Sequence, residues 1–389
     1  MKIFLVDLAL YKMGGVERVI STLANRMVDR HDVEICSLYR HNQKPFYDYD
    51  KRVGLRYLID LSNAKSSVSK SKAGFFFFRV LEKIHEQIFL DKKIELFCRD
   101  YLMKCDAVIF GRTSTAVLFL PHMKEYRGRV VVRDAIHLYD TSASAKRCMK
   151  KYFPHLVNTF IVSSEESREL YRKFFGQNMV KIEKMYNPLG IIPKLGDPLN
   201  YKRIIGVGRY THQKGFDNLL QAFAIVHVKH PEWRLSLIGE GEEYCHYMSI
   251  CRKLGIINYV EFKKSTDIVE EYNQSGIFVM TSRHEGYANA LVEAMACGLP
   301  AISYDWYVGV NDIIKDKENG IIVHLHDRER YFKTGFCDAI DVNNLAEAIN
   351  KLIENRELRQ KISQKAANIV ESRNASKIVD QWIKIIEEE

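Results

Sequence analysis

Short apolar runs alternate with helical patterns along the whole chain. In the first half, the apolar runs have the length of buried strands and fall at Ile3–Val6, Val33–Leu38, Ala107–Phe110, Val130–Val132 and Thr159–Val162. Five more follow in the second half, at Arg203–Val207, Leu235–Ile238, Val260–Phe262, Ile277–Met280 and Ala301–Ser303. Helical spacing appears between them, for example near 16–30, 75–104 and 164–175. Strands that alternate with helices predict parallel α/β sheets, and the two sets of strands predict two such sheets.

The stretch 185–201, MYNPLGIIPKLGDPLNY, interrupts both patterns and holds three of the eight prolines. Because 389 residues exceed the size of one hydrophobic core, we place a domain boundary near 190–200. The predicted domains are 1–190 and 191–374, with a final helix near 375–389 that packs back on the first domain. Two doubly wound, Rossmann-like sheets facing across a cleft would bind ligands at the carboxyl ends of their strands.

Composition narrows the class of protein. The eight cysteines form no CxxC pair, which favours reduced thiols over disulfides or a zinc site. Asp7 interrupts the apolar N-terminus, so this segment predicts a first strand rather than a signal peptide. No apolar run approaches the roughly 18 residues that cross a bilayer. These features indicate a cytoplasmic protein that is either soluble or peripheral to a membrane.

Charge is unevenly distributed between the two halves. Of the net charge of +9, residues 1–190 contribute +12 and residues 191–389 contribute −3. A basic half indicates an anionic partner, which can be nucleic acid or an anionic membrane surface. The alternative is a scattered, solvated surface charge without a partner.

Glycines and cations follow the first strand of each half. Gly14 and Gly15 precede the helical pattern that begins at Val16, where they would let an anion approach the helix N-terminus or would form only a turn. In IIGVGRYTHQKGFDNLL (204–220), Arg209 and Lys214 flank a loop before a helix, an arrangement that suits a diphosphate. A solvated surface loop is the alternative. A dinucleotide fingerprint would require glycine at position 211, which is threonine.

The stretch SRHEGYANALVEAMACGLP (282–300) places Glu285 and Glu293 eight residues apart. We expect a helix from about 288–289 that stops at Gly298, before Pro300. Helical rise then puts the carboxylates roughly 12 Å apart at most, a distance comparable to the span of a nucleotide-sugar's diphosphate. An exposed, structural Glu293 is the alternative, but this helix is apolar nearly all round and a buried, unpaired carboxylate would be costly.

These residues resemble one family specifically. Glu285 and Glu293 form the E-x7-E pattern of retaining glycosyltransferases with the GT-B fold, and the chain is most similar to family 4 (glycosyl transferases group 1). GVGRYTHQKG and GGVER match that family, as do ENGIIV (318–323) and the G-E-G of LIGEGEE (237–243). The resemblance covers nearly the whole chain, is strongest over 204–323 and is weak between about 40 and 105.

The resemblance implies a nucleotide-sugar donor held by the C-terminal domain and an acceptor held by the N-terminal one. It implies contacts of Arg209 and Lys214 with the diphosphate, of Glu285 with the sugar hydroxyls and of Glu293 with the ribose. It also places Gly14 and Gly15 near the diphosphate and His137 near the donor sugar, where a lone histidine is otherwise more often structural. The remaining donor-binding residues lie between the two glutamates: Gly286, Tyr287, Ala288 and Asn289.

The reaction that the resemblance implies is transfer of a hexose or N-acetylhexosamine with retention of configuration, by a front-side route, with no metal and no cofactor. Asp48 and Asp50 lie in YDYDK, outside any matching metal motif. Family frequency favours a UDP-sugar. The acceptor expected is a lipid-linked surface polysaccharide precursor such as an O-antigen, lipopolysaccharide or capsule unit. The alternatives are a synthase acting on a small soluble acceptor and, more remotely, a non-catalytic nucleic-acid-binding protein, which would leave the E-x7-E stretch unexplained.

Four features depart from the family pattern or lie outside it. Ala288 stands where proline or glycine is common, and Asp312 where glutamate is common. The charged stretch 324–341 is longer than the family norm and has no assigned role. Residues 65–93 combine four phenylalanines with clustered lysines. This combination predicts contact with the anionic inner face of the cell membrane. Burial of Phe75–Phe78 in the core is the alternative.

Overall fold

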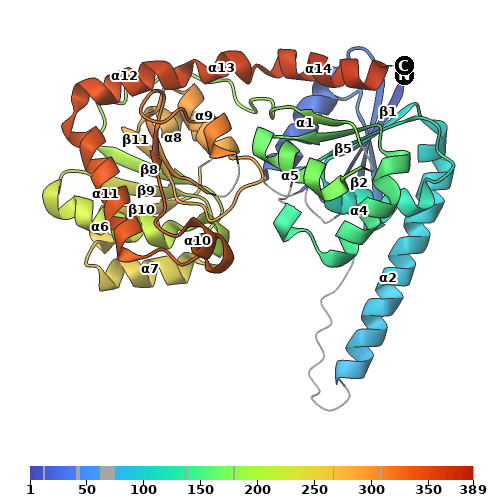
Figure 1. Ribbon diagram of the computed structural model, residues 1–389, viewed down its shortest axis with the longest axis horizontal. Helices are drawn as coiled ribbons and strands as arrows, with labels where there is room; N and C mark the ends of the chain where they lie inside the picture. The colour runs from blue at the N-terminus through green and yellow to red at the C-terminus, as the bar shows by residue number, and fades with distance from the viewer. Residues whose placement is uncertain are drawn as a thin grey trace. The chain divides into compact units, whose positions relative to one another are not determined.

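A computed structural model describes residues 1–11, 14–40, 44–61, 75–135, 138–177, 180–265, 267–306 and 309–388, with the side chains of 75–86 and Asp140 excepted. The chain divides into two compact units (Figure 1). The N-terminal unit comprises Met1–Ser163, Ser167–Pro188 and Ala375–Glu389. The C-terminal unit comprises Ser164–Glu166 and Leu189–Asn374.

The N-terminal unit is built on a seven-stranded sheet of order β3-β2-β1-β4-β5-β6-β7, in which every pair of neighbours is parallel. Its strands are β1 (Lys2–Asp7), β2 (Asp32–Arg40), β3 (Gly54–Asp60), β4 (Ala107–Phe110), β5 (Arg129–Arg133), β6 (Thr159–Val162) and β7 (Ile182–Lys184). Its helices are α1 (Gly15–Met27), α2 (Phe75–Asp100), α3 (Thr113–Phe119), α4 (Ala143–Leu156), α5 (Glu165–Phe175) and the C-terminal α14 (Ala375–Glu387). Trp382 and Ile383 of α14 pack in one core with Leu23 of α1 and Ile3 of β1.

The C-terminal unit has a six-stranded parallel sheet of order β10-β9-β8-β11-β12-β13. The strands are β8 (Arg203–Val207), β9 (Arg234–Ile238), β10 (Val260–Lys263), β11 (Ile277–Met280), β12 (Ala301–Tyr304) and β13 (Ile321–Val323). The helices are α6 (Phe216–Lys229), α7 (Tyr244–Lys253), α8 (Ile268–Asn273), α9 (Asn289–Ala296), α10 (Arg328–Thr334), α11 (Ala339–Glu354), α12 (Arg356–Ala367) and α13 (Ile369–Ser372). Crossovers of this kind cover both faces of a sheet, so one core holds α6 and α11 and a second core holds α9.

The prediction of two parallel α/β sheets is confirmed. The ten predicted strands all form, and four have the predicted bounds: β4, β6, β8 and β11. Three strands were not predicted, namely β3, β7 and β13, and each lies at an edge of its sheet. The predicted helix over 75–104 is too long, because α2 ends at Asp100 and a separate 3-10 turn covers Leu102–Lys104.

A buried ion cluster joins the ends of β1 and β4 in the N-terminal unit. The Arg112 guanidinium donates to the Asp7 carboxylate (Nε to Oδ1, 2.6 Å) and to the Glu17 carboxylate (2.6 Å). Asp7 is fully buried and Glu17 is nearly so. Burial raises the pKa of the Glu17 carboxyl, and the Arg112 guanidinium opposes that rise. The cluster thus holds the first turn of α1 on the end of β1.

We expect Arg112→Met to lower the free energy of unfolding by about 3–5 kcal/mol, because two buried carboxylates would lose their counter-charge. Urea unfolding followed by circular dichroism measures this change. Arg99→Met, which removes an exposed pair with Asp100, is the control and should leave the midpoint in place. A loss below about 1 kcal/mol for Arg112→Met would mean that the cluster contributes no more than an exposed pair.

Candidate active site

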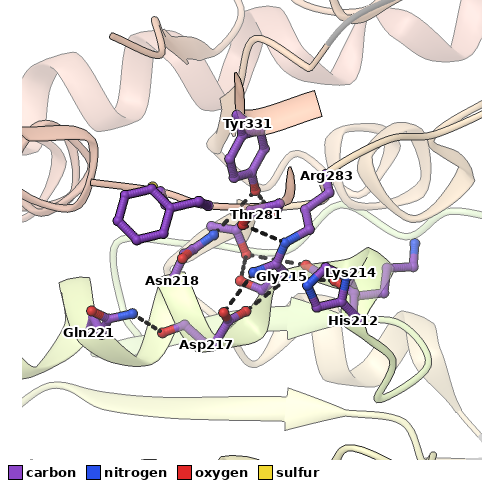
Figure 2. Close-up of polar contacts among 12 residues, drawn as sticks. His212, Lys214, Gly215, Asp217, Asn218, Gln221, Thr281, Arg283 and Tyr331 are labelled. Carbon is purple, nitrogen blue, oxygen red and sulfur yellow. Dashed lines mark hydrogen bonds and ion pairs between the residues drawn. The ribbon is translucent and has the colours of Figure 1, made fainter. Parts of the chain in front are cut away.

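Two loops of the C-terminal unit meet at the carboxyl ends of β8 and β11. The first contains the 3-10 turn His212–Lys214 and Gly215, and the second runs from Thr281 to Ala288. Gly215 has φ +62°, and a Cβ there would lie 2.1 Å from the Thr281 carbonyl oxygen, so only glycine permits this approach (Figure 2). The Arg283 N–H donates to the Gln213 carbonyl at 2.8 Å, and the Gln213 amide donates back to the His284 carbonyl at 2.9 Å.

A partly buried ion pair connects these loops. Lys214 Nζ lies 2.7 Å from Glu285 Oε1, and the two side chains are 15% and 8% exposed. The lysine stem runs beside Gly208, where a Cβ would lie 2.8 Å from Lys214 Cε. The acidic partner of Lys214 comes from a segment 71 residues away in the sequence. The pair fixes one positive and one negative charge at the ends of two parallel strands, where α/β folds bind ligands.

Arg209 follows β8 directly and points a second cation toward solvent. Its side chain is exposed and makes no ion pair or hydrogen bond within the described part of the chain. The charge of Arg209 is therefore available to a bound anion, whereas the ammonium of Lys214 already pairs with Glu285.

Helix α9 places the second glutamate. It begins at Asn289 and ends at Ala296, as predicted, with Ala288 as an N-cap that offers no side-chain hydrogen bond. Glu293 lies in its second turn and is 4% exposed, so the alternative of an exposed helix residue is wrong. N–H groups of a first helical turn have no intrahelical acceptor. The Asn289 N–H donates instead to the Tyr287 carbonyl at 2.9 Å, which ties the start of α9 to the loop that carries Glu285.

Arg373, near the end of the C-terminal unit's sequence, fixes the Tyr287 side chain. The Tyr287 hydroxyl accepts a hydrogen bond from Arg373 Nε at 2.6 Å, and Arg373 also donates to the Asp312 carbonyl at 2.9 Å. Arg373 is buried. Asp312, which departs from the family pattern, accepts at its carboxylate from the Glu165 N–H at 3.1 Å. These contacts fix the loop that carries Glu285 on the side facing α13.

A cavity of about 520 Å³ opens at the carboxyl ends of β8, β9 and β10. A Cβ at Gly239 would lie 1.9 Å from the Gly208 carbonyl oxygen. Because Gly208 in turn adjoins Lys214, the cavity lies close to the ion pair. Its lining combines aromatic rings, glycines and charges: Tyr210, Gly239, Glu240, Gly241, Tyr244, Phe262, Lys263 and Lys264. Sequence analysis singled out only the G-E-G of this set. A second cavity, of about 410 Å³, lies at the amino ends of the same strands, away from every predicted site residue.

The other predicted site residues lie elsewhere. His137 is outside the described residues. Gly14 and Gly15 belong to the N-terminal unit, where Gly14 is the extended N-cap of α1 and Gly15 is its first residue rather than its predecessor. A Cβ at Gly14 would lie 2.1 Å from Glu17 Oε2, which is a structural reason for glycine. No group of three or more His, Cys, Asp or Glu residues suited to a metal occurs among the described residues.

The fold has close counterparts among solved structures, and it is the GT-B fold. The pneumococcal O-GlcNAc transferase GtfA, solved in complex with UDP and GlcNAc, superposes with a TM-score of 0.75 at 16% identity, covering 100% of this chain and 98% of that one. Residues 191–369 match the family model for glycosyl transferases group 1.

Curated relatives cover nearly the full length. This chain is 26% identical over 377 residues to an uncharacterized glycosyltransferase of Haemophilus influenzae, covering 96% of each chain. It is 26% identical over 379 residues, again covering 96% of each chain, to the amylovoran biosynthesis glycosyltransferase AmsD of Erwinia amylovora. The chain is a glycosyltransferase, and residues 191–369, most of its C-terminal unit, match the glycosyl transferases group 1 family model.

Proposed function

We propose that this enzyme is a retaining glycosyltransferase of family 4 that transfers a hexose or N-acetylhexosamine from a UDP-sugar to a glycan acceptor. The observation that carries the proposal is the partly buried Lys214–Glu285 pair, 2.7 Å long, at the carboxyl ends of β8 and β11. It stands beside a helix whose Glu293 is buried and a cavity lined by aromatic rings. Together these groups match the three parts of a nucleotide-sugar.

Each part of the donor has a matching group. Glu285, oriented by Lys214, accepts hydrogen bonds from the sugar hydroxyls, and Glu293 accepts them from the ribose hydroxyls. Lys214 and Arg209 face the diphosphate, and the segment Gly286–Asn289 lies beside it. Stacking of the base on an aromatic ring suits the cavity, where the Tyr210 and Tyr244 rings are stacked 6.3 Å apart. The N-terminal unit then holds the acceptor, and contact of Gly14, Gly15 and His137 with the donor stays a prediction from the family resemblance.

Charge development explains why cations are placed there. As the bond from the anomeric carbon to the phosphate oxygen breaks, negative charge grows on the departing UDP and positive charge grows on the sugar ring. Lys214 and Arg209 stabilise the departing charge without a metal or cofactor. The acceptor oxygen forms its bond on the same face of the sugar, and its hydroxyl proton passes to the released phosphate oxygen. The products are the extended glycan and UDP, with configuration retained.

The identity of donor and acceptor is supported by similar proteins. GtfA was solved with UDP and GlcNAc, which favours uracil as the base. AmsD acts in amylovoran biosynthesis, which favours a growing surface polysaccharide, such as a lipid-linked O-antigen or capsule precursor, as the acceptor.

A donor-turnover assay tests the proposal. The enzyme is incubated with UDP-glucose, UDP-galactose, UDP-N-acetylglucosamine and the GDP and ADP analogues, and released nucleoside diphosphate is measured with and without a lipid-linked glycan pool. We expect release from a UDP-sugar that rises with the acceptor. Release from none of these donors under either condition would contradict the proposal, and release that needs only a small soluble sugar would favour the synthase alternative.

Contact with an anionic membrane is a separate part of the proposal. Residues 65–74 lie outside the described residues, and α2 side chains are described from Gln87 onward. There Ile88 and Phe89 are 62% and 52% exposed, and Lys93 Nζ lies 5.5 Å from the Phe89 ring centre. Apolar side chains beside lysines suit an anionic lipid surface. No helix among the described residues is long and apolar enough to cross a bilayer.

We expect the protein to float with vesicles that contain anionic lipid at low salt, and Ile88→Ser/Phe89→Ser to reduce the floating fraction severalfold by removing inserted apolar area. The control is Ile225→Ser/Val228→Ser, which removes two exposed apolar side chains from α6 in the less basic half. Equal flotation of the two variants would show that α2 does not contact the membrane. Flotation with neutral vesicles alone would show that electrostatic attraction does not drive the binding.

A further inference from the structure

The long charged segment 324–341 forms a helix that reaches the candidate site. Its core is α10, capped at its start by the Asp327 side chain, which accepts from the Arg330 N–H at 2.8 Å. Tyr331, in the middle of α10, is 1% exposed. Gly335 ends the helix in a left-handed conformation with φ +68°. The segment is therefore an ordered part of the C-terminal unit rather than a solvated charged loop.

The Tyr331 hydroxyl connects both site loops. It donates to the Thr281 carbonyl at 2.8 Å and accepts from Asn218 Nδ2 at 3.2 Å (Figure 2). Thr281 in turn donates from its own hydroxyl to the Gly215 carbonyl at 2.8 Å. Gly215 and Thr281 immediately follow Lys214 and β11, respectively. Through this one hydroxyl, α10 is joined to the backbone that carries Lys214 and to the strand end that leads to Glu285.

Arg283 forms the second connection. Its side chain is 5% exposed, and its Nε donates to the Gly335 carbonyl at 2.8 Å. The same guanidinium donates to Asp217 at 3.1 and 2.7 Å and to the His212 carbonyl (Figure 2). A Cβ at Gly335 would lie 2.3 Å from Arg283 Nε and 2.6 Å from His212 Cε1. The contact therefore depends on glycine at the end of α10.

We propose that α10 and Gly335 position the donor site, with Tyr331 acting through Thr281 and Gly335 acting through Arg283 to set the Lys214–Glu285 geometry. Neither residue touches the ion pair, so both are positioning residues. This inference rests on the proposed function for its catalytic consequence, but the coupling of the loops to α10 stands on the contacts alone. On this inference, the unusually long segment 324–341 affects the rate of sugar transfer and does not bind a partner.

A matched pair of tyrosine variants tests the proposal. Tyr331→Phe keeps the ring and removes the hydroxyl that bonds to the site loops. The control is Tyr304→Phe: Tyr304 is fully buried, and its ring centre lies 5.7 Å from that of Tyr331. Its hydroxyl, however, bonds to Cys337 Sγ at 3.3 Å and to the Asp341 carbonyl at 3.4 Å, and to neither site loop. Both variants lose one buried hydroxyl, so both should lose similar stability.

We expect Tyr331→Phe to lower kcat roughly 10- to 100-fold with a smaller change in the KM for donor, because misplaced groups cost rate. Tyr304→Phe should retain wild-type kcat. Hydrogen exchange provides a readout that needs no activity: the amides of 212–216 and 281–285 should exchange faster in Tyr331→Phe and in a second variant, Gly335→Ala, but not in Tyr304→Phe.

The outcomes separate this inference from the proposed function. Equal kcat and equal loop exchange in the two tyrosine variants would overturn the inference while a wild type that turns over a UDP-sugar keeps the function. A wild type that turns over no nucleotide-sugar would overturn the function, and the exchange pattern alone would then decide whether α10 holds the loops.

Discussion

Replacing Lys214 by alanine is expected to lower kcat for sugar transfer by about 100- to 1,000-fold, the usual effect of removing one preorganised group that stabilises transition-state charge. The side chain is largely buried and its ammonium lies 2.7 Å from Glu285. Its loss would remove a cation from the departing diphosphate and would also free Glu285 from its fixed orientation. Steady-state assays with the preferred UDP-sugar measure the change.

Two further variants separate catalysis from folding. Lys229→Ala removes an exposed lysine that pairs with Glu354 in the same unit, and it should leave kcat unchanged. Lys214→Met/Glu285→Gln replaces the partly buried pair with neutral groups of similar size, which typically restores stability, but it should remain inactive. Near-wild-type kcat in Lys214→Ala would contradict the assignment of the ion pair, as would recovery of activity in the double variant.

Replacing Glu293 by glutamine is expected to weaken binding of UDP-sugar by about 10- to 100-fold, the range expected when hydrogen bonds to a charged acceptor, worth about 1.5–3 kcal/mol, are lost. Glu293 is 4% exposed on α9, so water cannot easily replace it as the acceptor for ribose hydroxyls. Isothermal titration calorimetry with UDP and with uracil measures the effect. Only ligands that carry the ribose should be affected.

The matched control is Glu354→Gln, which changes a glutamate on α11 that pairs with Lys229 and His230 at the surface. We expect unchanged UDP affinity in this variant. Wild-type affinity in Glu293→Gln, with the protein still folded by circular dichroism, would show that the second glutamate of the E-x7-E pattern stabilises α9 rather than a ligand.

Most of the sheet architecture could be predicted because central parallel strands are buried on both faces and therefore consist of continuous apolar runs. The three strands that were not predicted lie at sheet edges, although the edge strand β10 was predicted. Along β3, GLRYLID, polar and apolar residues are mixed, and Arg56 faces Glu34 of the neighbouring strand. The last strand, β13, has only three residues, which is too short for a periodic pattern.

The candidate site could be predicted where its residues are close in sequence. Glu285 and Glu293 share one loop and helix, so local patterns were enough to place them. Contacts between distant segments could not be predicted: Lys214 meets Glu285 across 71 residues and Tyr331 meets Thr281 across 50. The only local signals for the contacts of α10 with the site loops were an arginine two residues before Glu285 and an unusually long segment after β13. Nothing in either pattern indicates which side chains meet.

The measurement that tests the central claim most directly is thermal unfolding of the wild type and of Glu293→Gln in the presence of UDP, GDP or ADP. A ligand that binds only the folded state stabilises it by about 2.7 kcal/mol at 100 times its dissociation constant. We expect UDP to raise the Tm of the wild type and GDP and ADP to raise it less. The rise with UDP should be smaller in Glu293→Gln. An unchanged Tm with all three nucleotides, or an equal rise with UDP in both proteins, would contradict a donor site built around these two glutamates.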